Sequence, residues 1–255
     1  MPPPTPKNAE KTPAASPMAT RRTGVSYGDV RIVLVRSAAI CGLIAVLVSL
    51  AGALPATAGP PPIVARSIYV VQPDPRLCPS PLCGGYWVSR ANHARTRCHD
   101  GLLRSRCYVA IALSTLTRKP LTAGLPANTL VRAVFGSWTF EGFGELGAVD
   151  VAEAWKPVGR EPPTGDFFRI RDLGVRCIRA PCYSFRAWRL NRPYRITVSD
   201  VDLGPARSPP ETLQRGEAAL TTPEGLLASG GIVRTSDGGR VFRASQVFLR
   251  AAPRA

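Results

Sequence analysis

The stretch CPSPLCGGYWVSRAN, residues 78–92, returns in altered form as CIRAPCYSFRAWRLN, residues 177–191. Aligned without a gap, the two stretches share a C-x4-C pair, an aromatic residue, an arginine and an asparagine. The likeness continues upstream, where SIYVVQPDPRLC lies over DFFRIRDLGVRC. The chain has only seven cysteines, so chance agreement at two of them is improbable. The motif therefore indicates an internal duplication, and its recurring arginine and asparagine favour a role in the fold over a role with a ligand.

The two copies, 66–158 and 159–254, predict an all-β or β-rich fold of two similar units. Runs such as SIYVV and CYVAIAL are rich in β-branched and aromatic residues, and glycines punctuate them. A unit of roughly 90 residues buries a thin core, so we expect the two units to pack as one disulfide-stapled domain. The first copy carries an inserted hairpin between Cys98 and Cys107. One short helix is expected near 209–220, opened by Pro209–Pro210.

The N-terminal segments predict export. Residues 1–36 are rich in proline and alanine and lack an apolar period, so we expect a disordered extension. Residues 37–58 form an uncharged apolar run that ends in an A-x-A pattern, which is typical of a cleaved signal peptide. Residues 59–65 would then be a linker. The alternative is an uncleaved N-terminal transmembrane helix, because an apolar run of this length can span a bilayer.

The cysteines that follow the apolar run are even in number, which implies disulfides in an exported chain. They are Cys78, Cys83, Cys98, Cys107, Cys177 and Cys182. The simplest pairing joins each C-x4-C pair within itself and closes the inserted hairpin. A cross-unit pair, such as Cys78–Cys182, stays open at this point.

Metal, redox and nucleophile chemistry have weak support. Cys78, Cys83, Cys98 and His99 could supply zinc ligands, but the second copy has no histidine and export favours oxidation. The C-x4-C spacing is not the C-x-x-C of a redox site. His93 is the other histidine, and no G-x-S-x-G motif is present. We therefore expect no catalytic residue, no metal and no cofactor.

Positive charge is the other broad feature of the chain, with 33 Lys+Arg against 17 Asp+Glu and a net charge of +16. The arginines are spread along the sequence, which a GC-rich genome would also produce. A basic face would suit an anionic envelope polymer or a lipid surface, and no specific nucleic acid is expected. The signal peptide or anchor would add transient membrane contact. The arginines proposed for the basic face are Arg90, Arg95, Arg97, Arg186, Arg189 and Arg192, with Arg104, Arg106 and Arg195 beside them.

The segments YVVQPDPRLCPSPLCGGYWVSRAN and GVRCIRAPC resemble a family of exported bacterial proteins that is known only as a domain of unknown function. The likeness covers about residues 66 to 250. The resemblance implies export and a single domain, and it brings no activity with it.

A non-catalytic exported β module with a structural or binding role is the function that these observations favour. Two alternatives remain open. Proline-rich, disulfide-braced loops are rigid and exposed, which suits a secreted protease inhibitor. Paired carboxylates would suit an envelope hydrolase, and sequence alone does not exclude them.

Overall fold

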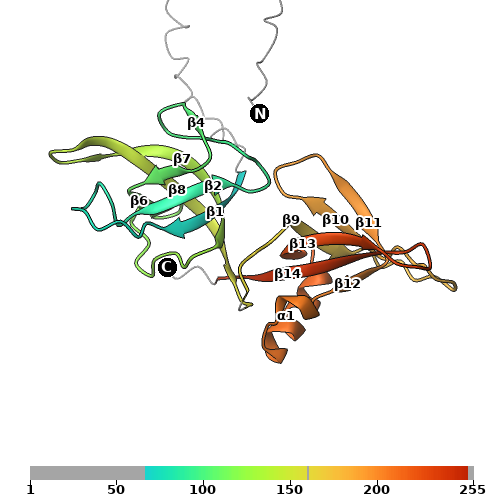
Figure 1. Cartoon of the computed structure of the whole chain (residues 1–255). Coiled ribbons are helices and arrows are strands. Elements are labelled where there is room, and N and C mark those ends of the chain that lie inside the picture. The colour runs from blue at the N-terminus through green and yellow to red at the C-terminus, as the bar shows by residue number, and fades with distance from the viewer. Residues whose placement is uncertain (1–66, 160, 252–255) are drawn as a thin grey trace, which may run out of the picture. The chain divides into compact units, whose positions relative to one another are not determined.

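The computed structural model describes residues 67–159 and 161–251 (Figure 1). The predicted extension, the signal peptide and the linker all lie outside the described residues. Within the described part the fold is β-rich, as predicted, and it contains one α-helix. That helix is not long and apolar enough to span a bilayer, nor is any other helical segment of the described residues.

The N-terminal half is an antiparallel sheet in the order β5-β2-β1-β7-β8. Strand β6 pairs with β8 in parallel, and a separate two-stranded hairpin is formed by β3, directly before Cys98, and β4, between Cys98 and Cys107. The strands are β1 (Ser67–Pro73), β2 (Tyr86–Arg90), β3 (Thr96–Arg97), β4 (Leu103–Arg104), β5 (Cys107–Val109), β6 (Ile111–Ser114), β7 (Thr129–Phe140) and β8 (Gly144–Pro157).

The C-terminal half is an antiparallel sheet in the order β14-β13-β9-β10-β11, with β12 pairing in parallel with β14. The elements are β9 (Asp166–Asp172), β10 (Phe185–Arg189), β11 (Arg195–Val198), β12 (Asp200–Asp202), a 3-10 turn η1 (Gly204–Ala206), α1 (Pro210–Leu220), β13 (Leu226–Arg234) and β14 (Arg240–Arg250). Helix α1 begins at Pro210 and lies where the sequence predicts a helix.

The two halves follow the same strand plan. In each half a short strand, β5 or β11, pairs with one sheet edge. After a single residue the chain continues as β6 or β12 and pairs with the opposite edge. Each half therefore closes on itself as a small barrel-like sheet. The halves meet where β14 pairs with β8, through Phe248↔Pro157, Leu249↔Lys156 and Arg250↔Trp155.

Each half has its own core, and a third core joins them. Val71, Val88 and Val149 belong to the N-terminal core, and Ile170 and Phe242 belong to the C-terminal core. The joining core is formed by the buried side chains of Ile68, Ala91, Leu130, Leu190, Leu227 and Phe248. The joining core connects the two halves, so the described residues form one folded domain.

Asn92 and Asn191 connect the two halves through side-chain hydrogen bonds. Asn92 donates from Nδ2 to the carbonyl oxygens of Phe167, at 2.7 Å, and Leu190, at 3.0 Å. Its Oδ1 accepts a hydrogen bond from the Phe167 amide at 2.8 Å. The backbone φ of Asn92 is 60°, in the left-handed region that asparagine tolerates better than most residues.

Asn191 makes the same three bonds in the opposite direction. Its Nδ2 donates to the carbonyl oxygens of Ile68, at 2.6 Å, and Ala91, at 3.0 Å, and its Oδ1 accepts from the Ile68 amide at 2.9 Å. Its φ is 57°. Each of these asparagines thus forms hydrogen bonds with backbone groups of the other half, so both serve the fold.

Candidate functional site

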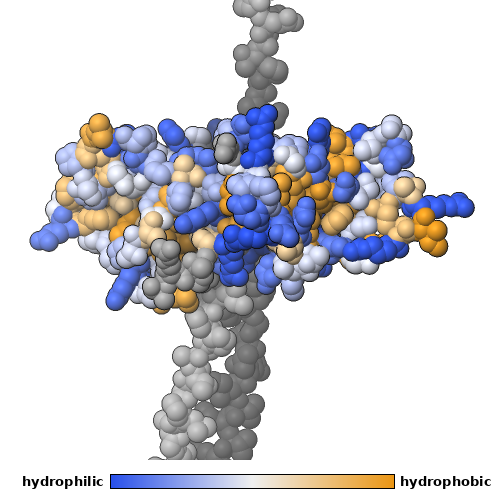
Figure 2. Space-filling view, turned by 90° about the horizontal axis from the view of Figure 1, so that it is seen from below, coloured by the Kyte–Doolittle hydropathy of each residue, from blue (hydrophilic) through white to orange (hydrophobic). Residues whose placement is uncertain are grey.

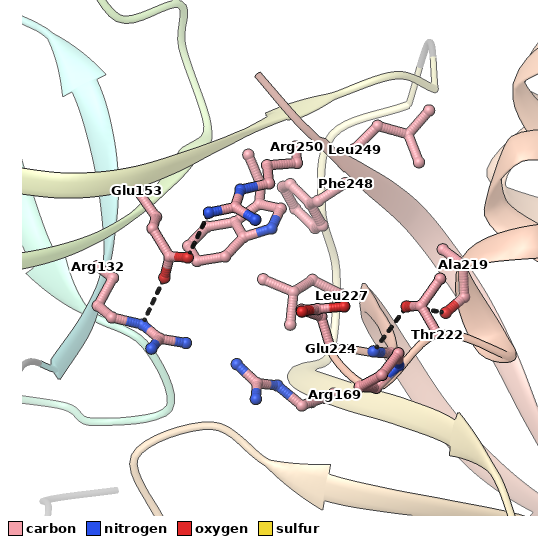
Figure 3. A pocket seen from close by; sticks show the side chains of 13 residues that line it. Arg132, Glu153, Arg169, Ala219, Thr222, Glu224, Leu227, Phe248, Leu249 and Arg250 are labelled. Carbon is pink, nitrogen blue, oxygen red and sulfur yellow. Dashed lines mark hydrogen bonds and ion pairs between the residues drawn. The ribbon is translucent and has the colours of Figure 1, made fainter. Parts of the chain in front are cut away.

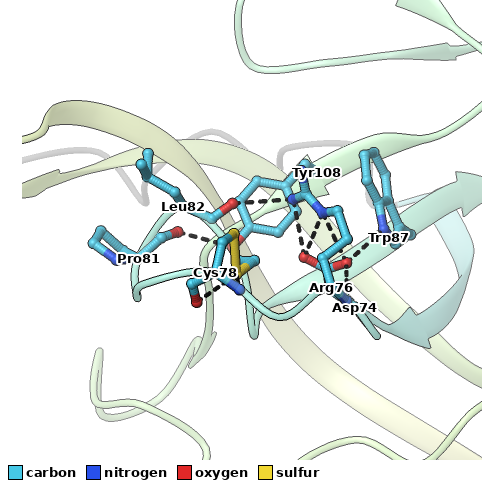
Figure 4. The surroundings of a disulfide bond; sticks show 8 residues. Asp74, Arg76, Cys78, Pro81, Leu82, Trp87 and Tyr108 are labelled. Carbon is cyan, nitrogen blue, oxygen red and sulfur yellow. Dashed lines mark hydrogen bonds and ion pairs between the residues drawn. A yellow bond between two sulfur atoms is a disulfide. The ribbon is translucent and has the colours of Figure 1, made fainter.

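The first C-x4-C loop is held by a buried acid and a stacked arginine (Figure 4). Asp74 accepts hydrogen bonds from Arg76 Nε, at 3.0 Å, and from Trp87 Nε1, at 3.1 Å. The Arg76 guanidinium lies between the rings of Trp87 and Tyr108, 5.0 and 4.9 Å from their centroids, and donates to the Leu82 carbonyl. Tyr108 donates to the Pro81 carbonyl at 2.8 Å. These contacts make the loop a structural corner.

The hydrogen bonds from Arg76 are the main reason that the pKa of Asp74 falls from 3.8 to about 2. A pKa below the unfolded value means that ionised Asp74 stabilises the fold above about pH 4, and that this contribution is lost as the pH falls towards 2. We expect Asp74→Asn to lower the melting temperature at pH 7, by a margin that shrinks between pH 4 and pH 2. Asp100→Asn, in an exposed pair with Arg104, is the control and should change little. An Asp74→Asn deficit that is equal at pH 7 and pH 2 would contradict this account.

All three local disulfides are present, namely Cys78–Cys83, Cys98–Cys107 and Cys177–Cys182. The cross-unit pair is therefore not formed. Three disulfides fit an oxidising compartment. Beside them, Leu77 and Ile178 are fully exposed, at 103% and 104% of the reference area. Figure 2 shows apolar side chains reaching the surface in separate small groups among hydrophilic ones.

The arginines that the sequence nominates have different surroundings. Arg90 packs near Tyr69 with its Nε buried, and Arg95 and Arg97 are exposed beside the β3–β4 hairpin. Arg189 pairs with Asp166.

The remaining two nominated arginines are Arg192 and Arg186. Arg192 donates from Nε to the Asn92 carbonyl at 3.1 Å, so it serves the joint between the halves. Arg186 lies on the outer face of the C-terminal sheet.

The two histidines have different surroundings. His93 Nε2 lies 3.0 Å from the Asn191 carbonyl, beside the interlocking asparagines. His99 borders an open hollow of about 600 Å³ with Tyr69, Ser137 and Glu145, and no side-chain hydrogen bond orders it within the described residues. No group of three His, Cys, Asp or Glu side chains able to hold a metal occurs in the described ranges.

A cavity of about 430 Å³ lies where the two halves meet, and it joins charged and apolar walls (Figure 3). Arg132, Glu153 and Trp155 reach it from β7 and β8, Arg169 from β9, and Phe248 and Arg250 from β14. The turn between α1 and β13 closes one side, with Thr222 and Glu224. Trp155, Phe248, Leu227 and Leu249 supply the apolar wall.

Glu153 forms two ion pairs in the charged wall of the cavity. Its carboxylate pairs with Arg132 Nε at 3.0 Å and with the Arg250 guanidinium at 2.7 Å. Its side chain is only 23% exposed, so these two arginines neutralise a partly buried acid. Neither arginine is therefore wholly free for another anion.

Arg169 is different, because it has no carboxylate within 4.0 Å among the residues that the structure describes. Burial lowers the pKa of Arg169, the positive charge of Arg132 lowers it further, and Glu153 and Glu224 oppose both effects from a distance. Figure 3 shows the Arg132 and Arg169 guanidinium groups pointing towards each other across the cavity. An anion between two facing guanidinium groups would relieve their repulsion.

The charged and hydroxyl groups of the cavity lining come from three arginines, two glutamates and one threonine. Its lining contains no histidine, cysteine or serine. Its one hydroxyl, on Thr222, donates to the Ala219 carbonyl at 2.8 Å and accepts from the Gly225 amide at 3.2 Å. Of the carboxylates, Glu153 is tied to two arginines. The lining thus carries three guanidinium groups and two carboxylates, the second of which belongs to Glu224.

The family model for a domain of unknown function, DUF6748, matches residues 67–254. The chain belongs to DUF6748. No curated protein and no solved structure matches it. The DUF6748 match spans both halves, so the cavity between them lies within the family domain and not at a junction with another one.

Sequence reasoning about this DUF6748 domain missed Arg132, Arg169 and Arg250. For Arg169 a signal was present, because the gap-free alignment of the two copies places it over Val70. A charged arginine at a mid-strand position that holds valine in the other half marks Arg169 as a candidate functional residue. Arg132 and Arg250 carry no such signal, since only the pairing of β8 with β14 brings their strands together.

Proposed function

We propose that this DUF6748 domain is an exported, non-catalytic binding module that holds an anionic group in the cavity between its halves. One observation carries the proposal, namely the partly buried Arg169 guanidinium that faces Arg132 and has no acidic partner within 4.0 Å among the described residues. The disulfides and the predicted signal peptide support export. Carboxylate, sulfate and phosphate groups all match the planar donor set of arginine.

The test compares anion binding by wild-type protein with anion binding by the Arg169→Gln variant. We expect wild-type protein to bind inorganic phosphate or acetate at constant ionic strength, and Arg169→Gln to bind about tenfold more weakly, since one charge-assisted hydrogen-bonding group is lost. The melting temperature of the variant should equal or exceed that of wild type in the absence of anion, because the change removes an unpaired cation. Calorimetric titration and thermal melts measure these quantities.

Arg179→Gln is the matched control, because it removes the same charge from an exposed position in the second disulfide loop. It should leave anion affinity unchanged. Equal affinity in wild type, Arg169→Gln and Arg179→Gln would refute the proposed site.

The exposed aliphatic residues of the disulfide loops favour a second candidate, protease inhibition. Leu77 and Ile178 are presented in full to solvent beside short covalent rings, as an inhibitory loop would require. On this hypothesis, at least one serine protease of a broad panel should be inhibited at micromolar concentration, and Ile178→Asp or Leu77→Asp should abolish the inhibition. A panel without inhibition would remove this candidate.

A further inference from the structure

Beyond the cavity, the outer face of the C-terminal sheet carries a row of arginines around one tryptophan. On β9 and β10, Ile170 and Ala187 are fully buried and point into the core, so the residues next to them point outward. The strand register places Arg171 opposite Arg186 and Arg169 opposite Trp188. On the far side of Trp188, strand β11 places Arg195. Arg169 therefore belongs to the cavity and to this outer face at once.

The arginine row has no acid in direct contact within the described part of the chain. Arg169, Arg171, Arg186 and Arg195 form no ion pair with any described residue. Arg171 and Arg186 are like charges directly opposite on antiparallel strands, an arrangement that destabilises a sheet. Their guanidinium groups lie 5.8 and 5.9 Å from the Trp188 ring centroid. The ring thus keeps two cations beside it, and one face of the sheet stays strongly positive.

The N-terminal half fills the equivalent strand positions with other residues. In the identical register, β1 and β2 place Gln72 opposite Trp87 and Val70 opposite Ser89. These are the positions that β9 and β10 fill with Arg171, Arg186, Arg169 and Trp188. The same backbone plan is therefore built in one half with uncharged cross-strand pairs, although Arg76 and Arg106 stack on Trp87, and in the other half with cations opposite each other.

We infer that this outer face extends the cavity site into a track for an acidic polysaccharide. The inference rests on the proposed function, because Arg169 starts the track. Neighbouring strands lie about 4.8 Å apart, so the row from Arg169 to Arg195 spans about 10 Å, more than one small anion covers. Charges repeated along a polymer match such a row. The aromatic ring of Trp188, set between the cations, offers a surface on which a sugar ring can stack.

The test compares a polymer with a small anion. The probes are a galacturonate oligosaccharide of at least ten sugars, neutral dextran and inorganic phosphate, all at the same ionic strength. The double variant Arg171→Gln/Arg186→Gln copies the uncharged Gln72 of the other half at one position. We expect it to weaken oligosaccharide binding by about tenfold or more, with phosphate binding unchanged. Its melting temperature should not fall, since a repulsion is removed, whereas a purely structural role would lower it.

Arg215→Gln/Arg234→Gln is the control, because it removes two exposed arginines elsewhere in the same half. Equal oligosaccharide affinity in the two double variants would overturn the track, while phosphate binding that depends on Arg169 would leave the proposed function intact. Absence of phosphate binding would defeat the proposed function itself. Duplex DNA that binds more tightly than the oligosaccharide, with the same dependence on Arg171 and Arg186, would overturn the assignment to a polysaccharide.

Discussion

Phe248→Ala is expected to lower the free energy of unfolding by about 3–5 kcal/mol, the usual cost of truncating a fully buried phenylalanine. Phe248 is 1% exposed and lies on β14, the strand that pairs with both β13 and β8. Its ring packs 5.9 Å from that of Phe167, in the core that joins the halves. Because the side chain serves both halves, the variant should lose stability in each of them.

Urea unfolding followed by tryptophan fluorescence and circular dichroism measures this effect. Phe143→Ala is the control, since Phe143 is 46% exposed at the tip of the β7–β8 hairpin, and it should change stability by no more than about 0.5 kcal/mol. A Phe248→Ala loss as small as that of the control would show that the halves do not depend on a shared core.

Replacing Asn92 or Asn191 with alanine should cost about 2–4 kcal/mol each. Either change removes three hydrogen bonds across the halves and leaves partly buried backbone groups without partners. For a domain of this size the loss corresponds to a fall of about 6–12 °C in melting temperature. The double variant should lose more than either single one.

Two controls separate the hydrogen bonds from the backbone strain. Asn92→Gly removes the amide but accepts a positive φ, so it should be nearly as destabilising as Asn92→Ala. Asn128→Ala places alanine at a φ of 63° away from the joint, and its smaller cost measures strain and local bonding. If Asn92→Gly were as stable as wild type, the side-chain hydrogen bonds of Asn92 would contribute nothing to the stability of the fold.

The sequence predicted the elements that local pattern determines. The short strands, helix α1 and the hairpin between Cys98 and Cys107 follow from alternation, turn residues and cysteine spacing. The asparagines could be nominated because they recur, but their partners could not, since the bonds join residues about 75 to 123 positions apart. The duplication itself stays a prediction, because a shared strand plan is not a measure of common descent.

The candidate site was harder to foresee for a physical reason. A charge is free or neutralised only with respect to its neighbours in space, and the neighbours of Arg169 come from β7, β8 and the turn after α1. The nominated Arg186 does lie on the basic outer face, whereas the nominated Arg189 is paired with Asp166. Abundance of arginine therefore indicated charge without indicating where it is uncompensated.

The most direct test of the anion site is an NMR titration that observes arginine Nε–Hε signals. The Arg169 signal is assigned by its loss in Arg169→Gln, and phosphate is added at constant ionic strength. The account predicts that the Arg169 signal shifts and saturates, with the Arg132 signal following it and the exposed Arg179 signal unmoved. Arginine signals that all drift together without saturation, with Arg169 among them, would contradict it.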